Sequence, residues 1–358
     1  MSAVIIAEAG VNHNGSAELA FKLVEAAHDA GADIIKFQTF KAKSIVTSQA
    51  LQADYQVANT GKRETQLSML SRLELSHDLH FELLEYCKTL GIEFLSTAFD
   101  SESLNFLVHE LGLKRLKIPS GEITNAPLLL EHAATGCELI VSTGMATLGE
   151  IEAALGVIAF GYIRQEDSKP SQEAFQAAYL SQYGQQELKE KVTLLHCTTE
   201  YPAPLRDINL SAMNTLGSAF NLPVGYSDHS DGVLVPIAAA ARGAVVIEKH
   251  FTLDKNLEGP DHRASLDPDE LQDMVRSVRA VESAIGSGCK GPVSSELNNK
   301  AAVRKSLVAA RDISFGQPIS SEDIAVKRPG IGQSPFEFWN VQSRPASKDY
   351  REGDLIFE

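Results

Sequence analysis

The sequence lacks the features that mark nucleic-acid-binding and membrane proteins. Its 358 residues carry 47 acidic and 32 basic side chains, which gives a formal net charge of −15. A nucleic-acid surface needs clustered Lys and Arg, so this balance argues against such a partner. No stretch reaches the roughly 20 apolar residues of a membrane span, so we expect no membrane association.

Cysteine is scarce and scattered. Cys87, Cys137, Cys197 and Cys289 form no Cys-x-x-Cys pair, which argues against a zinc–cysteine site and against a disulfide framework. The N-terminal residues run straight into Val4–Ala7, without the basic segment or cleavage motif of a signal peptide. We therefore expect reduced thiols and a cytoplasmic location.

What the sequence does contain is an alternation of short β-branched runs and longer segments with helical periodicity. The expected strands begin at Val4, Asp33, Glu93, Leu116, Leu139, Val192, Val224 and Val245. Helical patterns such as Ala17–Ala30 and Asp78–Leu90 lie between most of them. Eight such units predict an α/β fold of the (β/α)8 barrel type. A doubly wound open sheet is the alternative, but no Gly-rich dinucleotide fingerprint follows the first strand.

The pattern changes near Gly286, and this change predicts the domain boundaries. We expect a barrel over residues 1–285, a Gly/Ser/Lys-rich linker over 286–300 and a small β-rich domain over 301–358. The small domain has three short strand candidates, Ser306–Ala310, Ala325–Lys327 and Asp354–Phe357. Within the barrel, the polar segment Gly161–Glu190 is interpreted as an insertion of surface helix without an assigned function.

Polar side chains follow every expected strand of the barrel. Active sites of such barrels lie at the C-terminal ends of the strands, so these side chains are the candidates for chemistry. They include Glu8, Lys36, Gln38, Thr97, Lys117, Ser120, Glu122, Ser142, Thr199, Tyr201, Ser227, His229, Glu248 and His250. One such cluster would be ordinary solvation of a loop. A cluster after each of eight strands is hard to explain in that way.

His229 and His250 end adjacent strands, and each has an acidic neighbour. A single His at a strand end is more often a hydrogen-bonded core residue, but two together favour a metal site. Imidazole with oxygen ligands suits Mn, Fe, Co or Zn. Since only two protein ligands are evident, the site would stay open to substrate and could polarise a carbonyl group. Glu248 could support such a site as an outer carboxylate.

Lys36 and Lys117 would be costly to bury in a barrel mouth unless they are paired. One interpretation is an anion clamp, in which the lysines and neighbouring hydroxyls hold a phosphate and a carboxylate. The other is a salt bridge to Glu8 or Glu122, and the two are compatible. Asp261, in the turn Gly259–His262, could bind a sugar hydroxyl, although the sequence alone favours a turn or capping role.

Longer motifs around these residues resemble the bacterial sialic acid synthase (NeuB) family, and they cover almost the whole chain. They are IIAEAGVNHNG at Ile5–Gly15, KFQTFKA at Lys36–Ala42, LSTAFD at Leu95–Asp100, KIPSGEITN at Lys117–Asn125, STGMAT at Ser142–Thr147, LLHCTTEYPAP at Leu194–Pro204, GYSDHS at Gly225–Ser230 and EKHFTLDKNLEGPDH at Glu248–His262. The segment KRPGIG at Lys327–Gly332 resembles the antifreeze-like (SAF) domain of that family.

The resemblance implies a barrel followed by an SAF domain that covers the barrel mouth of the partner in a domain-swapped homodimer. It implies a divalent metal on His229 and His250, with Mn²⁺ expected and Mg²⁺ or Co²⁺ as alternatives. Its implied phosphoenolpyruvate ligands are Lys36, Thr97, Lys117, Ser120, Ser142 and Ser227. Glu8, Gln38 and Glu122 would be catalytic, and Tyr201, Asp261, Arg328 and Thr199 would bind the sugar. Thr199 departs from the family, which can have Asn there.

The resemblance also implies an activity. We expect an N-acetylneuraminate synthase, which condenses phosphoenolpyruvate with the open-chain aldehyde of N-acetylmannosamine and releases phosphate. The alternative is an N,N'-diacetyllegionaminate synthase that uses a 2,4-diacetamido-2,4,6-trideoxymannose. A non-catalytic sugar-binding barrel is a third possibility, but it is disfavoured because both histidines and Lys36 are present.

Overall fold

The computed structural model describes residues 2–164 and 168–358, so residues 165–167 of the predicted insertion lie outside the described residues. The chain divides into two compact units, one that ends at Gly286 and one from Ser287 to Glu358. In the described residues, no helix is both long enough and apolar enough to cross a membrane.

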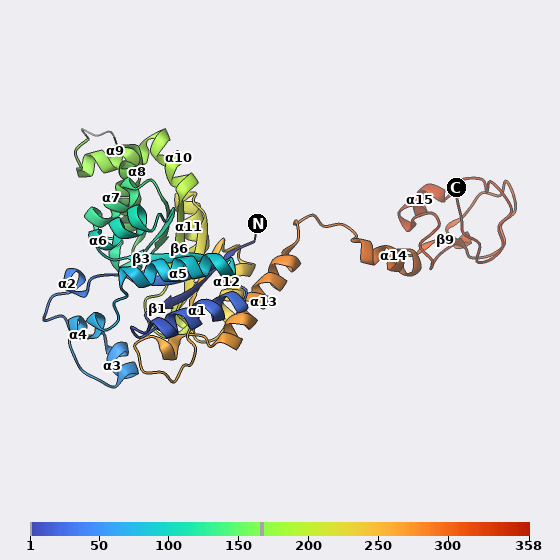
Figure 1. Cartoon of the computed structure of the whole chain (residues 1–358). Coiled ribbons are helices and arrows are strands. Elements are labelled where there is room, and N and C mark those ends of the chain that lie inside the picture. The colour runs from blue at the N-terminus through green and yellow to red at the C-terminus, as the bar shows by residue number, and fades with distance from the viewer. Residues whose placement is uncertain (1, 165–167) are drawn as a thin grey trace. The chain divides into compact units, whose positions relative to one another are not determined.

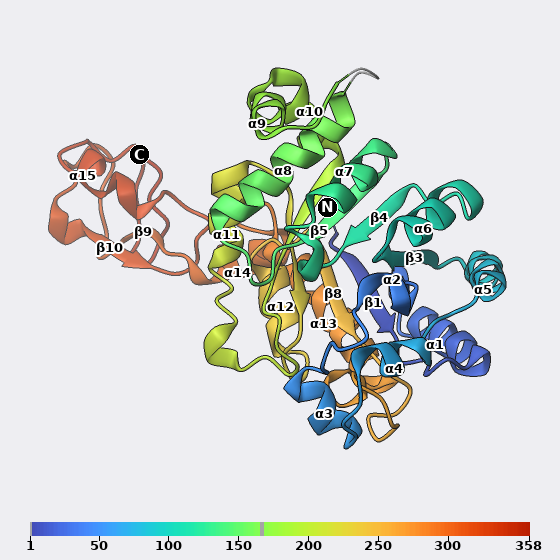
Figure 2. The ribbon, with the colours of Figure 1, turned by 90° about the vertical axis from the view of Figure 1, so that its left-hand side faces the viewer.

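The first unit is a closed barrel of eight parallel strands, each paired with its neighbours in chain order (Figures 1 and 2). The strands are β1 (Val4–Gly10), β2 (Ile34–Thr39), β3 (Glu93–Ala98), β4 (Arg115–Ile118), β5 (Glu138–Ser142), β6 (Val192–Cys197), β7 (Val224–Asp228) and β8 (Val246–His250). Pairing of β1 with β8 closes the barrel. The predicted (β/α)8 fold is confirmed.

Helices surround the barrel and begin at the residues that cap them. They are α1 (Ala17–Asp29), α5 (His77–Leu90), α6 (Ser101–Asn105), α7 (Ala126–Ala134), α8 (Leu148–Ile163), α11 (Ala212–Phe220), α12 (Leu234–Ala241) and α13 (Pro268–Ile285). Side chains of Ser16, Ser76, Thr147 and Asp267 accept hydrogen bonds from the first turns of α1, α5, α8 and α13. The helix α6 continues into a π-helical turn, η1 (Phe106–Glu110).

The interior of the barrel has an apolar layer below a polar one. The apolar layer consists of Ile6, Ile34, Leu95, Ile140, Leu195 and Val246. Two residues further along the same strands come Glu8, Lys36, Thr97, Ser142, Cys197 and Glu248. Since side chains two apart on a strand point to the same face, the apolar layer fills the barrel and the polar layer faces its C-terminal mouth.

The chain makes an excursion between β2 and α5 that the sequence patterns did not predict. It contains three short helices, α2 (Ala42–Ile45), α3 (Asp54–Thr60) and α4 (Gln66–Ser71). Apolar residues of the excursion pack with Val11 and Phe99 in a small cluster separate from the main core. The segment Gly161–Glu190 contains two helices, α9 (Gln172–Leu180) and α10 (Gln182–Lys191), which pack against α8.

The second unit has a two-stranded antiparallel sheet of β9 (Ser306–Ala309) and β10 (Ile324–Lys327) around its own apolar core. The predicted strand Asp354–Phe357 is wrong: only Leu355 forms a bridge, to Val308. Its backbone pairs with β9 only through the hydrogen bonds from Ala309 N to Asp354 O and from Ile356 N to Leu307 O, because a turn at Arg351–Asp354 precedes it and Glu358 N donates to the side chain of Gln333 instead. The other elements of the second unit are η5 (Ser294–Glu296), α14 (Leu297–Val303), η6 (Ser321–Asp323), η7 (Pro335–Glu337) and α15 (Phe338–Val341). Helix α14 begins within the predicted linker.

Candidate active site

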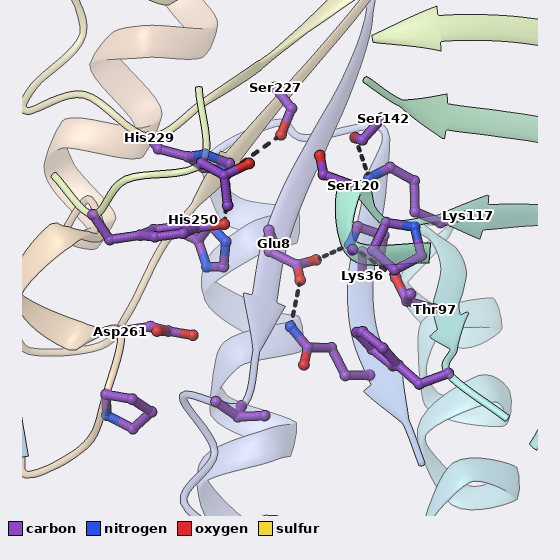
Figure 3. A pocket seen from close by; sticks show the side chains of 18 of the residues that line it. Glu8, Lys36, Thr97, Lys117, Ser120, Ser142, Ser227, His229, His250 and Asp261 are labelled. Atoms are coloured by element: carbon purple, nitrogen blue, oxygen red, sulfur yellow. Dashed lines mark hydrogen bonds and ion pairs between the residues drawn. The ribbon is translucent and has the colours of Figure 1, made fainter. Parts of the chain in front are cut away.

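A cavity of about 240 Å³ lies at the C-terminal mouth of the barrel. All predicted site residues except Glu122 and Arg328 line it (Figure 3). They come from the strand ends and from three adjoining segments, η2 (Ser120–Glu122), the loop after β6 and the turn after β8. The fold therefore brings residues that are far apart in the sequence to one cavity.

Two lysines and two carboxylates form the charged part of this cavity. Lys36 Nζ lies 2.7 Å from Glu8 Oε2 and 3.6 Å from Glu248 Oε2. Lys117 Nζ lies 3.2 Å from Glu248 Oε1 and donates a hydrogen bond of 2.7 Å to Ser142 Oγ. All four charged side chains are buried. The carboxylate partner of Lys117 is therefore Glu248, not Glu122.

Hydroxyl groups of adjacent strands hold this charged group in place. Lys36 Nζ donates to Thr97 Oγ1 at 3.1 Å, and Ser227 Oγ donates to Glu248 Oε1 at 2.9 Å. Gln38 Nε2 donates to Glu8 Oε1 at 3.3 Å. Thr97 and Ser142 lie beside lysines at the cavity surface, where an incoming anion could also accept a hydrogen bond from their hydroxyls.

The carboxyl groups of Glu8 and Glu248 differ in their pKa values. Burial raises the pKa of Glu8 to about 7, and Glu248 adds to this against the opposing effect of Lys36. Burial also disfavours ionisation of Glu248, but Lys117 and Lys36 outweigh it and hold the pKa of Glu248 at about 2. Glu8 can therefore exchange a proton near neutral pH, while Glu248 remains a fixed negative charge.

His229 and His250, the two predicted metal ligands, lie close together beside the cavity. Their ring centroids are 5.7 Å apart. His229 Nδ1 lies 2.6 Å from Thr198 O, so Nδ1 carries the proton and Nε2, beside the Tyr201 hydroxyl, is the unprotonated nitrogen. Among the described residues, the buried Nδ1 of His250 has no hydrogen-bond partner. Burial lowers the pKa of both imidazoles, to about 4 for His229, which keeps them neutral and able to bind a metal.

No third acidic, cysteine or histidine ligand joins this pair within the described ranges 2–164 and 168–358. The metal site that the sequence predicts on these two histidines, with substrate and water as the remaining ligands, stays a prediction. Tyr201 lies beside them, with its hydroxyl 3.2 Å from His229 Nε2.

Asp261 lies across the cavity from Lys117 and Ser142, with Glu8 between them (Figure 3). Its side chain is buried, and burial raises its pKa to about 6. Since salt bridges that involve Asp261 are absent from the described part of the chain, its carboxyl is available to hydroxyl donors of a ligand. This side of the cavity suits a polyhydroxy or acetamido compound better than a second anion.

Ser120 is held by the backbone of the next strand's loop. Its Oγ accepts a hydrogen bond of 3.0 Å from Gly144 N and lies 3.1 Å from Cys197 Sγ. A Cβ atom on Gly144 would lie 2.3 Å from Thr199 Oγ1 and 2.7 Å from Ser120 Oγ. Only glycine allows this approach, and because the Gly144 N–H occupies an acceptor position of Ser120, the serine proton can point towards a ligand.

Two predicted residues do not line the cavity. Glu122 Oε2 instead accepts a hydrogen bond of 2.7 Å from Asn125 Nδ2. Arg328 belongs to the second unit, where it is exposed and its Nε donates to Val303 O at 3.0 Å. The sequence also missed the contact of Glu248 with both lysines, although its alternation with His250 on β8 indicates that it faces the barrel interior.

The sequence reasoning missed a whole side of the cavity as well. It is lined by Val11, Met69, Leu70, Leu73 and Phe99. No sequence signal separates these residues from ordinary core residues, because an apolar side chain next to a ligand has the same character as one inside a core.

Comparison with known proteins agrees with this geometry. The NeuB family model matches residues 23–290, and the SAF domain model matches residues 304–357. The chain is 48% identical to an N,N'-diacetyllegionaminic acid synthase of Campylobacter jejuni, over 99% of each protein. It is 47% identical to an N,N'-diacetyllegionaminic acid synthase of Legionella pneumophila, over 99% of this chain and 94% of the relative.

A solved structure of a related synthetase also resembles this chain. The N-acetylneuraminic acid (sialic acid) synthetase from Leptospira borgpetersenii, crystallised with citrate, has a TM-score of 0.66 and 33% identity. The match covers 84% of this chain and 90% of that one. The predicted resemblance and the predicted enzyme class, a phosphoenolpyruvate-dependent synthase that forms a carbon–carbon bond, are confirmed. The chain belongs to the NeuB family.

Proposed function

We propose that this protein condenses phosphoenolpyruvate with 2,4-diacetamido-2,4,6-trideoxymannose to form N,N'-diacetyllegionaminate and phosphate. Identities of 48% and 47% to two synthases of that name support this sugar. The identity to the sialic acid synthetase is lower, at 33%. N-acetylmannosamine, which the sequence analysis favoured, is therefore the second candidate, and it is tested below in the same experiment.

The observation that carries the phosphoenolpyruvate half of the proposal is the buried pair of lysines beside four hydroxyls. Lys36 and Lys117 share a cavity surface with Thr97, Ser120, Ser142 and Ser227. A phosphate and a carboxylate on one small molecule need several cations and hydroxyl donors at close quarters. The two lysines and the four hydroxyls supply such a set within one cavity.

The proposed reaction forms one bond between carbons and breaks one bond to phosphate. C3 of phosphoenolpyruvate attacks the aldehyde carbon of the open-chain sugar, and the aldehyde oxygen becomes a hydroxyl. Water adds to C2, and phosphate leaves with cleavage of the C2–O bond. Glu8, with a pKa of about 7, is placed to accept the proton of that water, and the lysines hold the phosphate during the step.

His229 and His250 would hold the divalent metal, for which we propose Mn²⁺, with Mg²⁺ or Co²⁺ as alternatives. When bound, such an ion supplies Lewis-acid polarisation of an oxygen that becomes more negative during the reaction. The protein's part is to keep both imidazoles neutral by burial and to fix the His229 ring through Thr198 O.

We also propose the domain-swapped homodimer. Exposed aromatic residues of the second unit support it, among them Phe336 and Trp339, which are 90% and 74% exposed. The barrel has exposed apolar residues in loops and helix starts that follow its strands, such as Met145 and Leu205. These exposed apolar side chains are the candidates for the surfaces that the proposed dimer would bury.

A mixing experiment tests the swap. Lys36→Met inactivates a barrel, and Arg328→Ala impairs a second unit. If one subunit's SAF domain completes the other's site, random exchange of the two variants creates some dimers with one intact site, up to about a quarter of all sites. Activity at low sugar concentration should then rise well above that of either variant alone. Simple averaging of the two activities would count against the swap.

The product tests the reaction itself. The purified protein is incubated with phosphoenolpyruvate, Mn²⁺ and each candidate sugar, and the products are weighed by mass spectrometry. We expect the mass of N,N'-diacetyllegionaminate and one phosphate per product, with the solvent oxygen of ¹⁸O-water in the product and not in phosphate. Faster turnover of N-acetylmannosamine would make the second candidate the function. No product with either sugar would overturn the proposal.

A further inference from the structure

The active-site cavity has two chemically different sides. One side holds the lysines, carboxylates and hydroxyls described above. The other consists mainly of Val11, Met69, Leu70, Leu73 and Phe99, which we call the apolar wall, although Gln56 of the same excursion also lines the cavity. These five side chains come from three separate segments, the loop after β1, helix α4 with the residues that follow it, and the loop after β3. A binding site for charged and hydroxylated substrates alone would have no need of it.

The apolar wall is a built surface. Val11, Met69 and Leu73 are buried and form a small hydrophobic cluster with Phe40, apart from the main core. Met69 is fixed further, because Gln52 Nε2 donates to its sulfur at 3.4 Å and Gln52 Oε1 accepts from Glu64 N at 2.9 Å. The excursion between β2 and α5 thus presents a defined apolar face to the cavity.

The wall lies on the sugar side of the cavity. Asn59 Nδ2 of the same excursion donates to Pro260 O at 2.6 Å, next to Asp261. Met69, Leu73 and Pro260 also border one neighbouring surface cavity, so the excursion and the turn with Asp261 are in contact. Asp261 itself lies across the cavity from Lys117 and Ser142 (Figure 3). The part of a substrate that meets the wall is therefore the part away from the phosphate-binding lysines.

Apolar side chains discriminate between methyl groups and hydroxyl groups. A methyl group gains by leaving water against them, whereas a hydroxyl group loses its hydrogen bonds to water and receives none in return. The two candidate sugars differ in this respect. N-acetylmannosamine has hydroxyls at C4 and C6, and 2,4-diacetamido-2,4,6-trideoxymannose has an acetamido group and a methyl group there.

We infer that the apolar wall is the specificity-determining surface of this enzyme, and that it selects sugars with methyl-bearing groups at C4 and C6. This inference rests on the proposed function, since it assigns a role within the same cavity. Leu70 and Phe99 are the members to test, because they are only partly buried and line the cavity at the edge of the cluster. The buried members Met69 and Leu73 would damage the fold of the excursion if they were changed.

The test is Leu70→Gln, compared with Leu51→Gln as a matched control. Leu51 lies in the same excursion, is 78% exposed and is not one of the cavity-lining residues, so the same substitution there changes neither the wall nor the packing. For each variant, kcat/KM is measured with both sugars, and the KM of phosphoenolpyruvate is measured at saturating sugar.

We expect Leu70→Gln to reduce kcat/KM for the diacetamido trideoxy sugar about tenfold or more. With N-acetylmannosamine, kcat/KM should stay the same or rise, because the new amide can bind a hydroxyl. The KM of phosphoenolpyruvate should stay within twofold of its original value, and Leu51→Gln should resemble the unmodified protein throughout.

An equal reduction for both sugars, or no reduction, would overturn the role of the wall. Failure of the proposed function has a different signature, since the unmodified protein would then already prefer N-acetylmannosamine or use neither sugar. A shifted KM for phosphoenolpyruvate in Leu70→Gln would show that the wall meets the other substrate. Circular dichroism and a urea titration of both variants confirm that the fold is retained.

Discussion

Two groups of buried lysines and carboxylates lie on opposite faces of the same strand, β8. Inside the barrel, Glu248 contacts Lys36 and Lys117. Outside it, Lys249 contacts Asp228 of β7 at 2.5 Å, with both side chains completely buried. Lys249 also donates to Ser230 O, and Ser230 Oγ donates to Asp228. Because successive residues of a strand point to opposite faces, neighbours in the sequence have separate environments.

The difference between the two groups is whether they face a cavity. The outer group is satisfied entirely by protein atoms, and it joins the ends of β7 and β8 just where His229 and His250 follow. The inner group borders the cavity, where its lysines and hydroxyls can exchange partners with a ligand. Similar residue types therefore serve structure on one face and chemistry on the other. The inner group should matter to turnover, and the outer group to stability.

The largest effect should come from Lys36→Met. We expect kcat/KM for phosphoenolpyruvate to fall about 10³-fold or more, because a buried cation that stabilises the anionic substrate is removed. The free energy of unfolding should change by only about 1 kcal/mol, since Glu8 has a pKa of about 7 and can protonate at little cost. Steady-state kinetics and a urea titration measure the two quantities. A large loss of stability with a modest loss of activity would mean that the inner group, like the outer one, serves stability more than turnover.

Lys249→Met tests the other group. Removing the lysine leaves Asp228 buried without its partner, so we expect the free energy of unfolding to fall by about 3–5 kcal/mol in chemical denaturation. The double variant Asp228→Asn/Lys249→Met should recover much of this loss, because neither charge remains. If Lys249→Met unfolds at the same urea concentration as the unmodified protein, the outer pair contributes nothing to stability.

The strand-end residues show why so much of the site could be predicted from sequence. Period-two alternation places Glu8, Lys36 and Glu248 on the inner face, and the barrel topology then gathers them at one mouth. The eight strands were predicted within a few residues because their apolar runs are short and β-branched, and because helices of strong periodicity separate them.

The excursion between β2 and α5 could not be predicted in this way. Helices α2, α3 and α4 are 4, 7 and 6 residues long, too short for an apolar period to show. The partner of Lys117 was also beyond the sequence, because Glu122 and Glu248 are both plausible carboxylates and only the fold brings one within 3.2 Å. Tertiary contacts decide such choices, and the sequence contains only the candidates.

Asp261→Asn sharpens the comparison, because Asp261 is a buried carboxyl without a salt bridge in the described part of the chain. Its pKa is raised by burial from 3.8 to about 6. Between pH 4 and 6 the folded protein holds a proton that the unfolded chain has lost, so stability falls as the pH rises through this window. Asn removes that loss. The variant should be more stable above pH 6, by at most about 3 kcal/mol, with no difference below pH 4.

Urea titrations of both proteins at several pH values between 4 and 8 measure this difference. The same variant should raise the KM of the sugar, since Asn offers hydroxyl groups a weaker acceptor than a carboxylate. Equal stability of the two proteins at every pH would mean that Asp261 is solvated in the cavity. Water would then be the partner of the Asp261 carboxyl, whereas the carboxylates of both lysine groups are paired with protein cations.

Arg328 extends the comparison to a cation that is exposed and that forms no salt bridge within residues 2–164 and 168–358. An exposed side chain of this kind contributes little to stability, so Arg328→Ala should change the free energy of unfolding by less than about 0.5 kcal/mol. If Arg328 meets the sugar in the proposed dimer, the KM of the sugar should still rise about tenfold, as loss of a charged hydrogen bond predicts, while that of phosphoenolpyruvate stays constant. Lys327→Ala is the matched control, because Lys327 is an equally exposed cation beside it. An unchanged sugar KM in Arg328→Ala would show that its charge serves solvation alone, and that the cations of the site are confined to the barrel interior.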